Sequence, residues 1–118
     1  MKKSTLFLCI STLSLPMLSA YASNAPALHS PTHGVLCDRH MCADEKGISR
    51  ELTAKYLGEK TAAKLFSQGD FDLTAFTYSN GVFCDTKERL CRANRYFGTD
   101  GKRSGKALPS YTGILFGK

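Results

Sequence analysis

One short sequence occurs twice in this chain, and each copy leads to a second cysteine. Residues 34–38 read Gly-Val-Leu-Cys-Asp and lead to Cys42, whereas residues 81–85 read Gly-Val-Phe-Cys-Asp and lead to Cys91. In each copy a few polar residues separate the two cysteines, so a strand that turns back on itself would bring the sulfurs opposite one another. The pattern predicts two β-hairpins, each closed by its own disulfide.

The chain has five cysteines, and Cys9 lies in a segment that we expect to be removed. The remaining four allow three disulfide pairings. We favour Cys37–Cys42 and Cys84–Cys91, because each pair belongs to one predicted hairpin. The rival interpretation is a zinc site, although neither cysteine spacing is usual for zinc ligands.

The first residues have the organisation of a secretory signal peptide. Two lysines precede a largely apolar run from Thr5 to Met17, and residues 20–22 form a small-x-small cleavage site. The apolar run is shorter than the roughly 20 residues that a membrane-spanning helix needs. We therefore expect removal of residues 1–22, export to the periplasm without a membrane span, and a compartment in which disulfides persist.

The sequence after residue 22 predicts a single small α+β domain. Residues 23–33 suit an extended leader, and residues 34–118 form the disulfide-stapled domain. Besides the short N-terminal hairpin, we expect a three-stranded antiparallel meander over residues 73–79, 82–86 and 89–97. Its first turn is predicted at the Asn-Gly pair before Val82, because both residue types tolerate positive φ.

Two or three short helices are expected to pack against these strands. Ser49 is a plausible N-cap, and Gly58 ends or bends the helix that follows it. Residues 59–68 indicate a second short helix, and Pro109 can open a third near the C-terminus.

The repeat extends beyond the cysteines, over about residues 34–68 and 81–118. Each copy also contains a serine with a tyrosine seven residues further on: Ser49 and Tyr56, and Ser104 and Tyr111. We interpret the sequence as two degenerate copies of one unit of hairpin, loop and helix. The second copy has the longer hairpin and the shorter helical tail.

The charge is unevenly distributed. Without the two lysines of the signal segment the chain has 14 basic and 10 acidic residues, a net charge of 14 − 10 = +4. Residues 23–80 carry six basic and seven acidic side chains, and residues 81–118 carry eight basic and three acidic ones. The positive C-terminal half could attract an anionic partner. Its candidate basic surface consists of Arg89, Arg92, Arg95, Lys102, Arg103 and Lys106.

No group of residues in the sequence points to catalysis. His40 lies near Asp38 at an exposed hairpin tip, where nothing would exclude water or shift a pKa. Asp38 and Asp85 occupy equivalent places in the two copies, where an aspartate more often accepts hydrogen bonds from nearby backbone amides. The Gly- and Lys-rich residues 98–106 lack the spacing of a phosphate-binding loop. We therefore predict no catalytic residue, no metal site and no cofactor.

Five segments carry a resemblance to a known family. They read Lys-Tyr-Leu-Gly at 55–58, Asp-Leu-Thr-x-Phe-Thr at 72–77, Gly-Val-Phe-Cys-Asp-Thr-Lys-Glu-Arg-Leu-Cys-Arg at 81–92, Arg-Tyr-Phe at 95–97 and Asp-Gly-Lys-Arg-Ser-Gly at 100–105. With them the chain resembles the YcgJ-like, Fels prophage protein-like family of small exported enterobacterial proteins. The resemblance implies a periplasmic protein and brings no activity, cofactor or catalytic residue with it.

These features favour a non-enzymatic binding module that recognises another envelope or periplasmic protein, as an inhibitor, an immunity-type protein or an accessory factor. The prophage association favours a role in defence or competition by analogy. The alternative is a binder of an anionic polymer, such as lipopolysaccharide or nucleic acid outside the cytoplasm. In that case the basic residues would supply charge, and Tyr96 and Phe97 would stack on the ligand.

Overall fold

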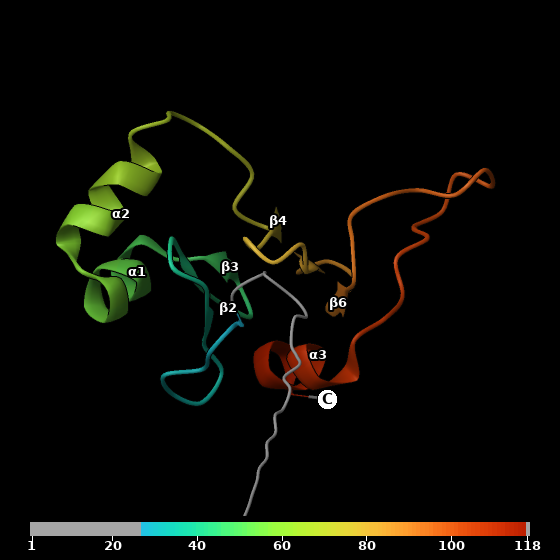
Figure 1. The fold of residues 1–118 in the computed structure, drawn as a ribbon, viewed down its shortest axis with the longest axis horizontal. Coiled ribbons are helices and arrows are strands. Elements are labelled where there is room, and N and C mark those ends of the chain that lie inside the picture. The colour runs from blue at the N-terminus through green and yellow to red at the C-terminus, as the bar shows by residue number, and fades with distance from the viewer. Residues whose placement is uncertain (1–26, 118) are drawn as a thin grey trace, which may run out of the picture.

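The computed structural model describes residues 27–117. The predicted signal peptide and residues 23–26 of the leader lie outside the described residues. Three helices and six short strands form the described part (Figure 1). In chain order they are β1 (Leu36–Cys37), β2 (Cys42–Asp44), β3 (Gly47–Ile48), α1 (Arg50–Leu57), α2 (Glu59–Phe66), β4 (Ala75–Thr77), β5 (Phe83–Asp85), β6 (Leu90–Arg92) and α3 (Pro109–Phe116).

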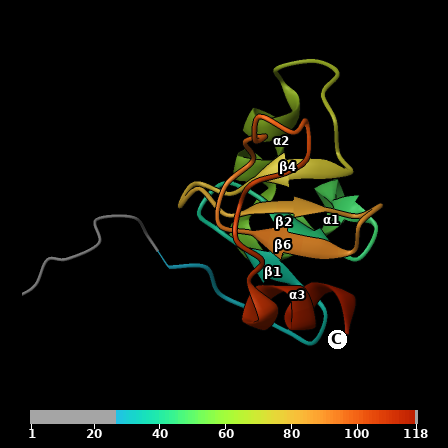
Figure 2. The same ribbon diagram turned by 90° about the vertical axis from the view of Figure 1, so that its right-hand side faces the viewer.

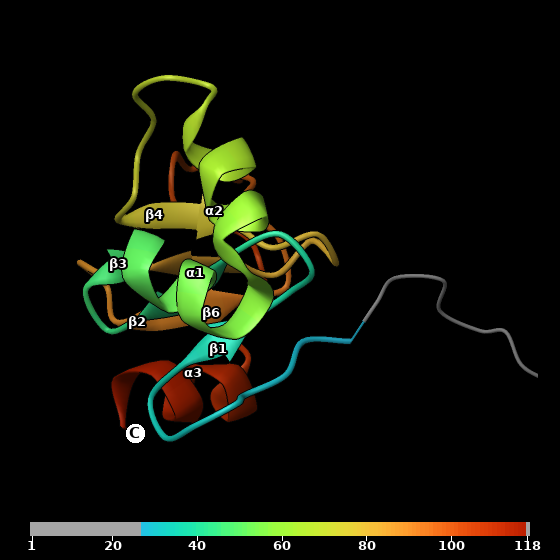
Figure 3. The ribbon, with the colours of Figure 1, turned by 90° about the vertical axis from the view of Figure 1, so that its left-hand side faces the viewer.

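The strands form two antiparallel three-stranded sheets, with the orders β1-β2-β3 and β4-β5-β6. The second sheet is the predicted meander, although its third strand ends at Arg92 and not at residue 97 as expected. The α+β class is confirmed. The first is the predicted N-terminal hairpin with one additional strand, β3. Figure 2 shows the strands stacked above α3, and Figure 3 shows α1 and α2 in front of them.

The first turn of the meander has three residues, not the expected two. Tyr78 N–H donates to the Val82 carbonyl at 2.8 Å, so residues 79–81 form the loop. Gly81 has a φ of 94°, which suits the left-handed residue that closes such a loop. This register places Phe76 opposite Cys84, both buried, whereas a two-residue turn would pair Cys84 with Thr77.

The helix boundaries follow the expected capping signals. The Ser49 hydroxyl accepts the Leu52 N–H at 3.0 Å, and Gly58, with a φ of 103°, separates α1 from α2. Pro109 is the first residue of α3, as predicted. Within residues 27–117, none of the helices has the length and apolar character needed to cross a membrane.

Both predicted disulfides are present, Cys37–Cys42 and Cys84–Cys91. All four cysteines are fully buried, and each bond joins residues directly opposite one another on neighbouring strands. Because the sulfurs are covalently paired, these cysteines are not zinc ligands. Cys84 and Cys91 lie in the main core, which contains side chains from both sheets and α3, among them Leu36, Phe76, Tyr78, Leu115 and Phe116. Cys37 and Cys42 lie with Val35 in a second, smaller cluster.

The two copies dock their helices by the same hydrogen bonds. Cys42 N–H donates to the Thr53 hydroxyl at 3.0 Å, and Cys91 N–H donates to the Thr112 hydroxyl at 2.9 Å. The carbonyl of each of these cysteines accepts the N–H of the helix N-cap, Ser49 at 2.9 Å or Leu108 at 2.8 Å.

These bonds set the register of the repeat. Ser49 is equivalent to Leu108 and Thr53 to Thr112, so the expected match of Ser49 with Ser104 is wrong by four residues. Serine is not needed at the second N-cap, because its backbone N–H and not its side chain makes the shared bond.

The part of the leader that the structure describes contacts the domain. His29 exchanges two backbone hydrogen bonds with Cys37, at 2.8 and 2.9 Å, and Leu28 packs against the core. The chain therefore adds a short bridge to the outer edge of β1 before the stapled hairpin begins.

Candidate functional site

Comparison of the two copies reveals a segment of the second copy that has no counterpart in the first. The cysteine and threonine that dock each helix are 11 residues apart in the first copy and 21 in the second. In the first copy, Asp44 pairs with Gly47 across two residues. In the second copy, Ala93 N–H bonds the Lys106 carbonyl across residues 94–105, which number 105 − 93 = 12. We call residues 94–105 the arm.

The arm runs out from β6 and back to α3, and in Figure 1 it projects on the side opposite α1 and α2. Ser104 N–H donates to the Tyr96 carbonyl at 3.0 Å, and Gly98 N–H donates to the Lys102 carbonyl at 2.8 Å. A bridge between Phe97 and Arg103 lies between these bonds. The arm is therefore a hydrogen-bonded hairpin with a defined conformation.

Arg103 fastens the arm to the second sheet. Its guanidinium carbon lies 4.3 Å from the ring centre of Phe83 in β5 and 4.2 Å from that of Phe97 in the arm. The same guanidinium donates to the Arg95 carbonyl. Cation–π contacts of this kind contribute about 0.5–1 kcal/mol each, more where water is excluded.

The base of the arm is fixed by a close backbone contact. A side chain at Gly105 would place its Cβ 2.4 Å from the Asn94 carbonyl oxygen, so only glycine fits there. Arg92 donates to the Gly105 carbonyl at 2.8 Å and pairs with Glu88 at 3.1 Å. The direction in which the arm leaves the domain is therefore set by its own two ends.

The arm exposes two aromatic side chains. Tyr96 is 61% exposed and Phe97 60%, and these are the exposed large hydrophobic residues among those that the structure describes. Arg95 lies over the Tyr96 ring at 5.5 Å. Exposed aromatic and arginine side chains are the residue types most enriched where proteins contact one another.

The structure places the six candidate basic residues in two groups. Arg89, Arg92 and Arg103 make internal contacts; Arg89 pairs with Glu45 at 3.6 Å and donates to the Phe116 carbonyl at 3.0 Å. Arg95, Lys102 and Lys106 have no acidic partner within residues 27–117. Three of the six residues therefore hold the fold together in addition to carrying charge.

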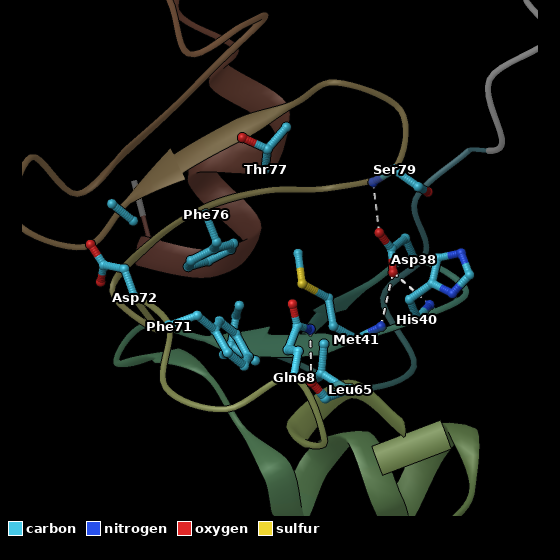
Figure 4. A pocket seen from close by; sticks show the side chains of 12 residues that line it. Asp38, His40, Met41, Leu65, Gln68, Phe71, Asp72, Phe76, Thr77 and Ser79 are labelled. Carbon is cyan, nitrogen blue, oxygen red and sulfur yellow. Dashed lines mark hydrogen bonds between the residues drawn. The ribbon is translucent and has the colours of Figure 1, made fainter. Parts of the chain in front are cut away.

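The two aspartates accept backbone hydrogen bonds, as expected from their position. Asp38 is 3% exposed and accepts the N–H groups of His40 at 2.7 Å, Met41 at 2.9 Å and Ser79 at 2.7 Å (Figure 4). Asp85 accepts the Lys87 N–H at 2.8 Å. The contact with Ser79 could not be read from the sequence, because it joins residues 41 positions apart.

No group of three or more histidine, cysteine, aspartate or glutamate side chains within residues 27–117 has the arrangement of a metal site. The feature that sequence reasoning passed over is the arm as a unit. Its signal was the Gly- and Lys-rich run of residues 98–106, but the insertion became visible only when the two threonines defined the register of the repeat.

Comparison with known proteins identifies the family. The sequence model of the YcgJ protein family matches residues 28–116. The chain is 55% identical over 102 residues to "Uncharacterized protein YcgJ" of Escherichia coli (strain K12), a match that covers 85% of this chain and 84% of that protein. No solved structure matches the chain significantly. Since the family match spans nearly the whole described domain, the chain belongs to the YcgJ family.

Proposed function

We propose that the protein is exported to the periplasm and acts there as a non-enzymatic binding module, which recognises another envelope protein through the arm. The observation that carries the proposal is the insertion itself. Where the first copy has a two-residue turn, the second has an ordered twelve-residue loop, whose exposed aromatic side chains are Tyr96 and Phe97.

The chemistry of the arm supports a protein partner. The two rings supply a large apolar surface, and Arg103 holds the Phe97 ring against the sheet, so little conformational freedom remains to be lost on binding. Tyrosine and arginine in such places are the usual sources of binding energy in protein interfaces. A partner with an apolar pocket and an acidic rim would complement this surface.

An anionic polymer is the second candidate. Tyr96 and Phe97 could stack on bases or sugars, and Lys102, Lys106 and Arg95 have no acidic partner within the described part of the chain. The charge of the arm is nevertheless small. Arg95, Lys102 and Arg103 against Asp100 give 3 − 1 = +2 for residues 94–105. This modest charge is why we favour a protein partner.

The test is affinity purification of the tagged full-length protein from the periplasm, comparing wild type with the double variant Tyr96→Ala/Phe97→Ala. We expect wild type to retain a defined protein, the double variant to lose it, and the complex to survive high ionic strength. Recovery of the tagged chain in unprocessed form from the cytosol would contradict the proposed location.

The matched control is Lys102→Ala/Lys106→Ala, which removes one positive charge from the arm and one from the residue directly after it and keeps both rings. We expect this variant to bind the protein partner nearly as well as wild type. If it loses binding while the aromatic variant keeps it, and if salt abolishes binding steeply, the ligand is an anionic polymer. An activity that Asp38→Asn removes without unfolding the protein would show that the module is an enzyme.

A further inference from the structure

The outer edge of β4 presents backbone groups that its own sheet does not use. Tyr78 N–H donates to the Val82 carbonyl and Thr86 N–H donates to the Thr74 carbonyl, both at 2.8 Å. The backbone N–H and C=O groups of residues 74, 76 and 78 therefore face β5. Along an antiparallel strand the direction of the backbone groups alternates. The N–H and C=O groups of the odd-numbered residues therefore face away from β5, at the edge of the sheet.

The N-terminal half of the chain pairs with this edge at its two ends. Ile48 N–H in β3 donates to the Leu73 carbonyl at 2.8 Å, and Asp38 accepts the Ser79 N–H at 2.7 Å (Figure 4). Between these contacts lie Ala75 and Thr77. Within residues 27–117, no hydrogen bond is made by the Ala75 carbonyl or by the Thr77 N–H and carbonyl.

A groove of about 440 Å³ lies beside this gap, lined by Ala75 and Thr77 together with residues of the first hairpin and α2. Figure 4 shows the side chains of Met41, Phe71 and Phe76 gathered at its centre. The groove is therefore apolar in its floor and has unpaired backbone donors and acceptors along one wall. Its volume is within the range of small-ligand sites, about 300–1,000 Å³.

One end of the groove is already polar and ordered. The Thr74 N–H and hydroxyl, and to a smaller extent the Ala75 N–H, hold the pKa of Asp72 below its ordinary value of 3.8. The Ala75 N–H lies close to Asp72, so the positions left to a ligand are the Ala75 carbonyl and the N–H and carbonyl of Thr77. A ligand must supply a donor and an acceptor in alternation to satisfy them.

We propose that this groove binds an extended segment of a polypeptide, which adds a strand to β4 by pairing with Ala75 and Thr77. An extended backbone repeats a donor and an acceptor at the spacing that the β4 edge requires, and its alternate side chains would point toward Met41, Phe71 and Phe76. The added strand would lie along β4 between two existing contacts, that of Ile48 with Leu73 and that of Asp38 with Ser79. This site is separate from the arm, so the inference does not depend on the proposed function.

The test uses a phage-displayed library of random short peptides, selected on the intact protein, followed by titration of the selected peptides in solution. Thr77→Pro removes the outward N–H; proline is tolerated there because that N–H lies on the free edge. Thr77→Val is the matched control, because it changes the side chain and keeps the N–H. We expect peptides to bind Thr77→Val like wild type and Thr77→Pro about tenfold or more weakly.

A second measurement does not depend on the folding of any variant. Backbone amides of a selected peptide are N-methylated one at a time. Methylation should abolish binding at every second position, where the amide pairs with β4, and should leave binding unchanged at the positions in between. In addition, the amide resonances of Ala75 and Thr77 should shift when the peptide is titrated into the protein. The proposal is overturned if no peptide is enriched, if N-methylation has no alternating effect, or if a well-folded Thr77→Pro variant binds as tightly as wild type. Tyr96→Ala/Phe97→Ala should leave peptide binding intact, which separates this site from the arm.

Discussion

At the scale of single residues, Asp38 shows how one carboxylate joins the two halves of the molecule. It accepts two N–H groups of its own hairpin tip and the N–H of Ser79 from the second half. Its counterpart Asp85 accepts one N–H in its own turn. The same residue type at equivalent positions thus has a long-range role in one copy and a local role in the other.

This difference predicts unequal effects of the same substitution. Asp38→Asn replaces one acceptor oxygen by a donor amide in a buried site that contains three N–H groups, so we expect a loss of about 2–3 kcal/mol in the free energy of unfolding. Asp85→Asn, half-buried with one N–H partner, should cost about 0.5–1 kcal/mol. Urea unfolding of both variants measures the difference, and equal losses would mean that the Ser79 contact contributes nothing.

Tyr78 gives the fold a pH dependence on the alkaline side. Burial, and then the charges of Asp38 and Asp44, raise the pKa of its phenol well above the ordinary 10.0. The unfolded chain loses this proton near pH 10 and the folded chain keeps it, so the phenol's contribution to stability is complete below that pH and is lost as pH rises further.

Tyr78→Phe should remove this dependence. It also removes the 2.7 Å hydrogen bond to the Leu36 carbonyl, so we expect the variant to be about 1–2 kcal/mol less stable at neutral pH. Unfolding free energies of both proteins, measured from neutral to strongly alkaline pH, should converge as the wild type loses its advantage. Curves that stay parallel would show that Tyr78 ionises equally in both states.

At the scale of elements, each stapled hairpin holds its helix through one buried threonine. Thr53 and Thr112 occupy the same turn of their helices and accept the N–H of the second cysteine of each copy. Both side chains are buried, so no water replaces them. The repeat is therefore a unit of hairpin and docked helix, held by a disulfide on one side of the strand and a threonine on the other.

Replacing either threonine with valine keeps the shape and leaves a cysteine N–H without a partner. We expect Thr53→Val and Thr112→Val each to lower the free energy of unfolding by about 1–3 kcal/mol, because each leaves one buried cysteine N–H without its acceptor. Thr61→Val in α2 is the control, since the two cysteine N–H groups bond Thr53 and Thr112 and neither bonds Thr61. Chemical denaturation measures all three, and a neutral Thr112→Val would contradict the equivalence of the two copies.

These elements also show what the sequence can predict. Ser49, Gly58 and Pro109 mark helix ends by local chemistry, and the cysteine pairs mark hairpins, so all of these predictions are confirmed. The register of the repeat and the three-residue turn depend on which buried side chains face each other, such as Phe76 and Cys84. The groove beside β4 follows from that register, because a shift of one residue would reverse the outward backbone groups.

At the scale of the whole molecule, two copies of one unit share a core, and the largest difference between the copies, the arm, lies outside that core. Side chains from the first sheet, the second sheet and α3 pack in one cluster. Arg89 links the copies at the surface, since it contacts both Glu45 and the carbonyl end of α3. The arm lies outside this arrangement and contacts it mainly through Arg92 and Arg103.

The last prediction removes the arm altogether. Replacing residues 94–105 with Asn-Gly restores the two-residue connection of the first copy, because Ala93 and Lys106 already pair as Asp44 and Gly47 do. The shortened chain loses the Arg103 contact that covers Phe83 and the Arg92 bond to Gly105, so we expect it to be about 1–3 kcal/mol less stable. It should still form both disulfides, unfold cooperatively and bind the selected β4 peptides, yet fail to retain the partner protein. If the shortened chain is unfolded in circular dichroism with its disulfides formed, the arm is part of the fold, and its aromatic side chains must be explained by stability instead of recognition.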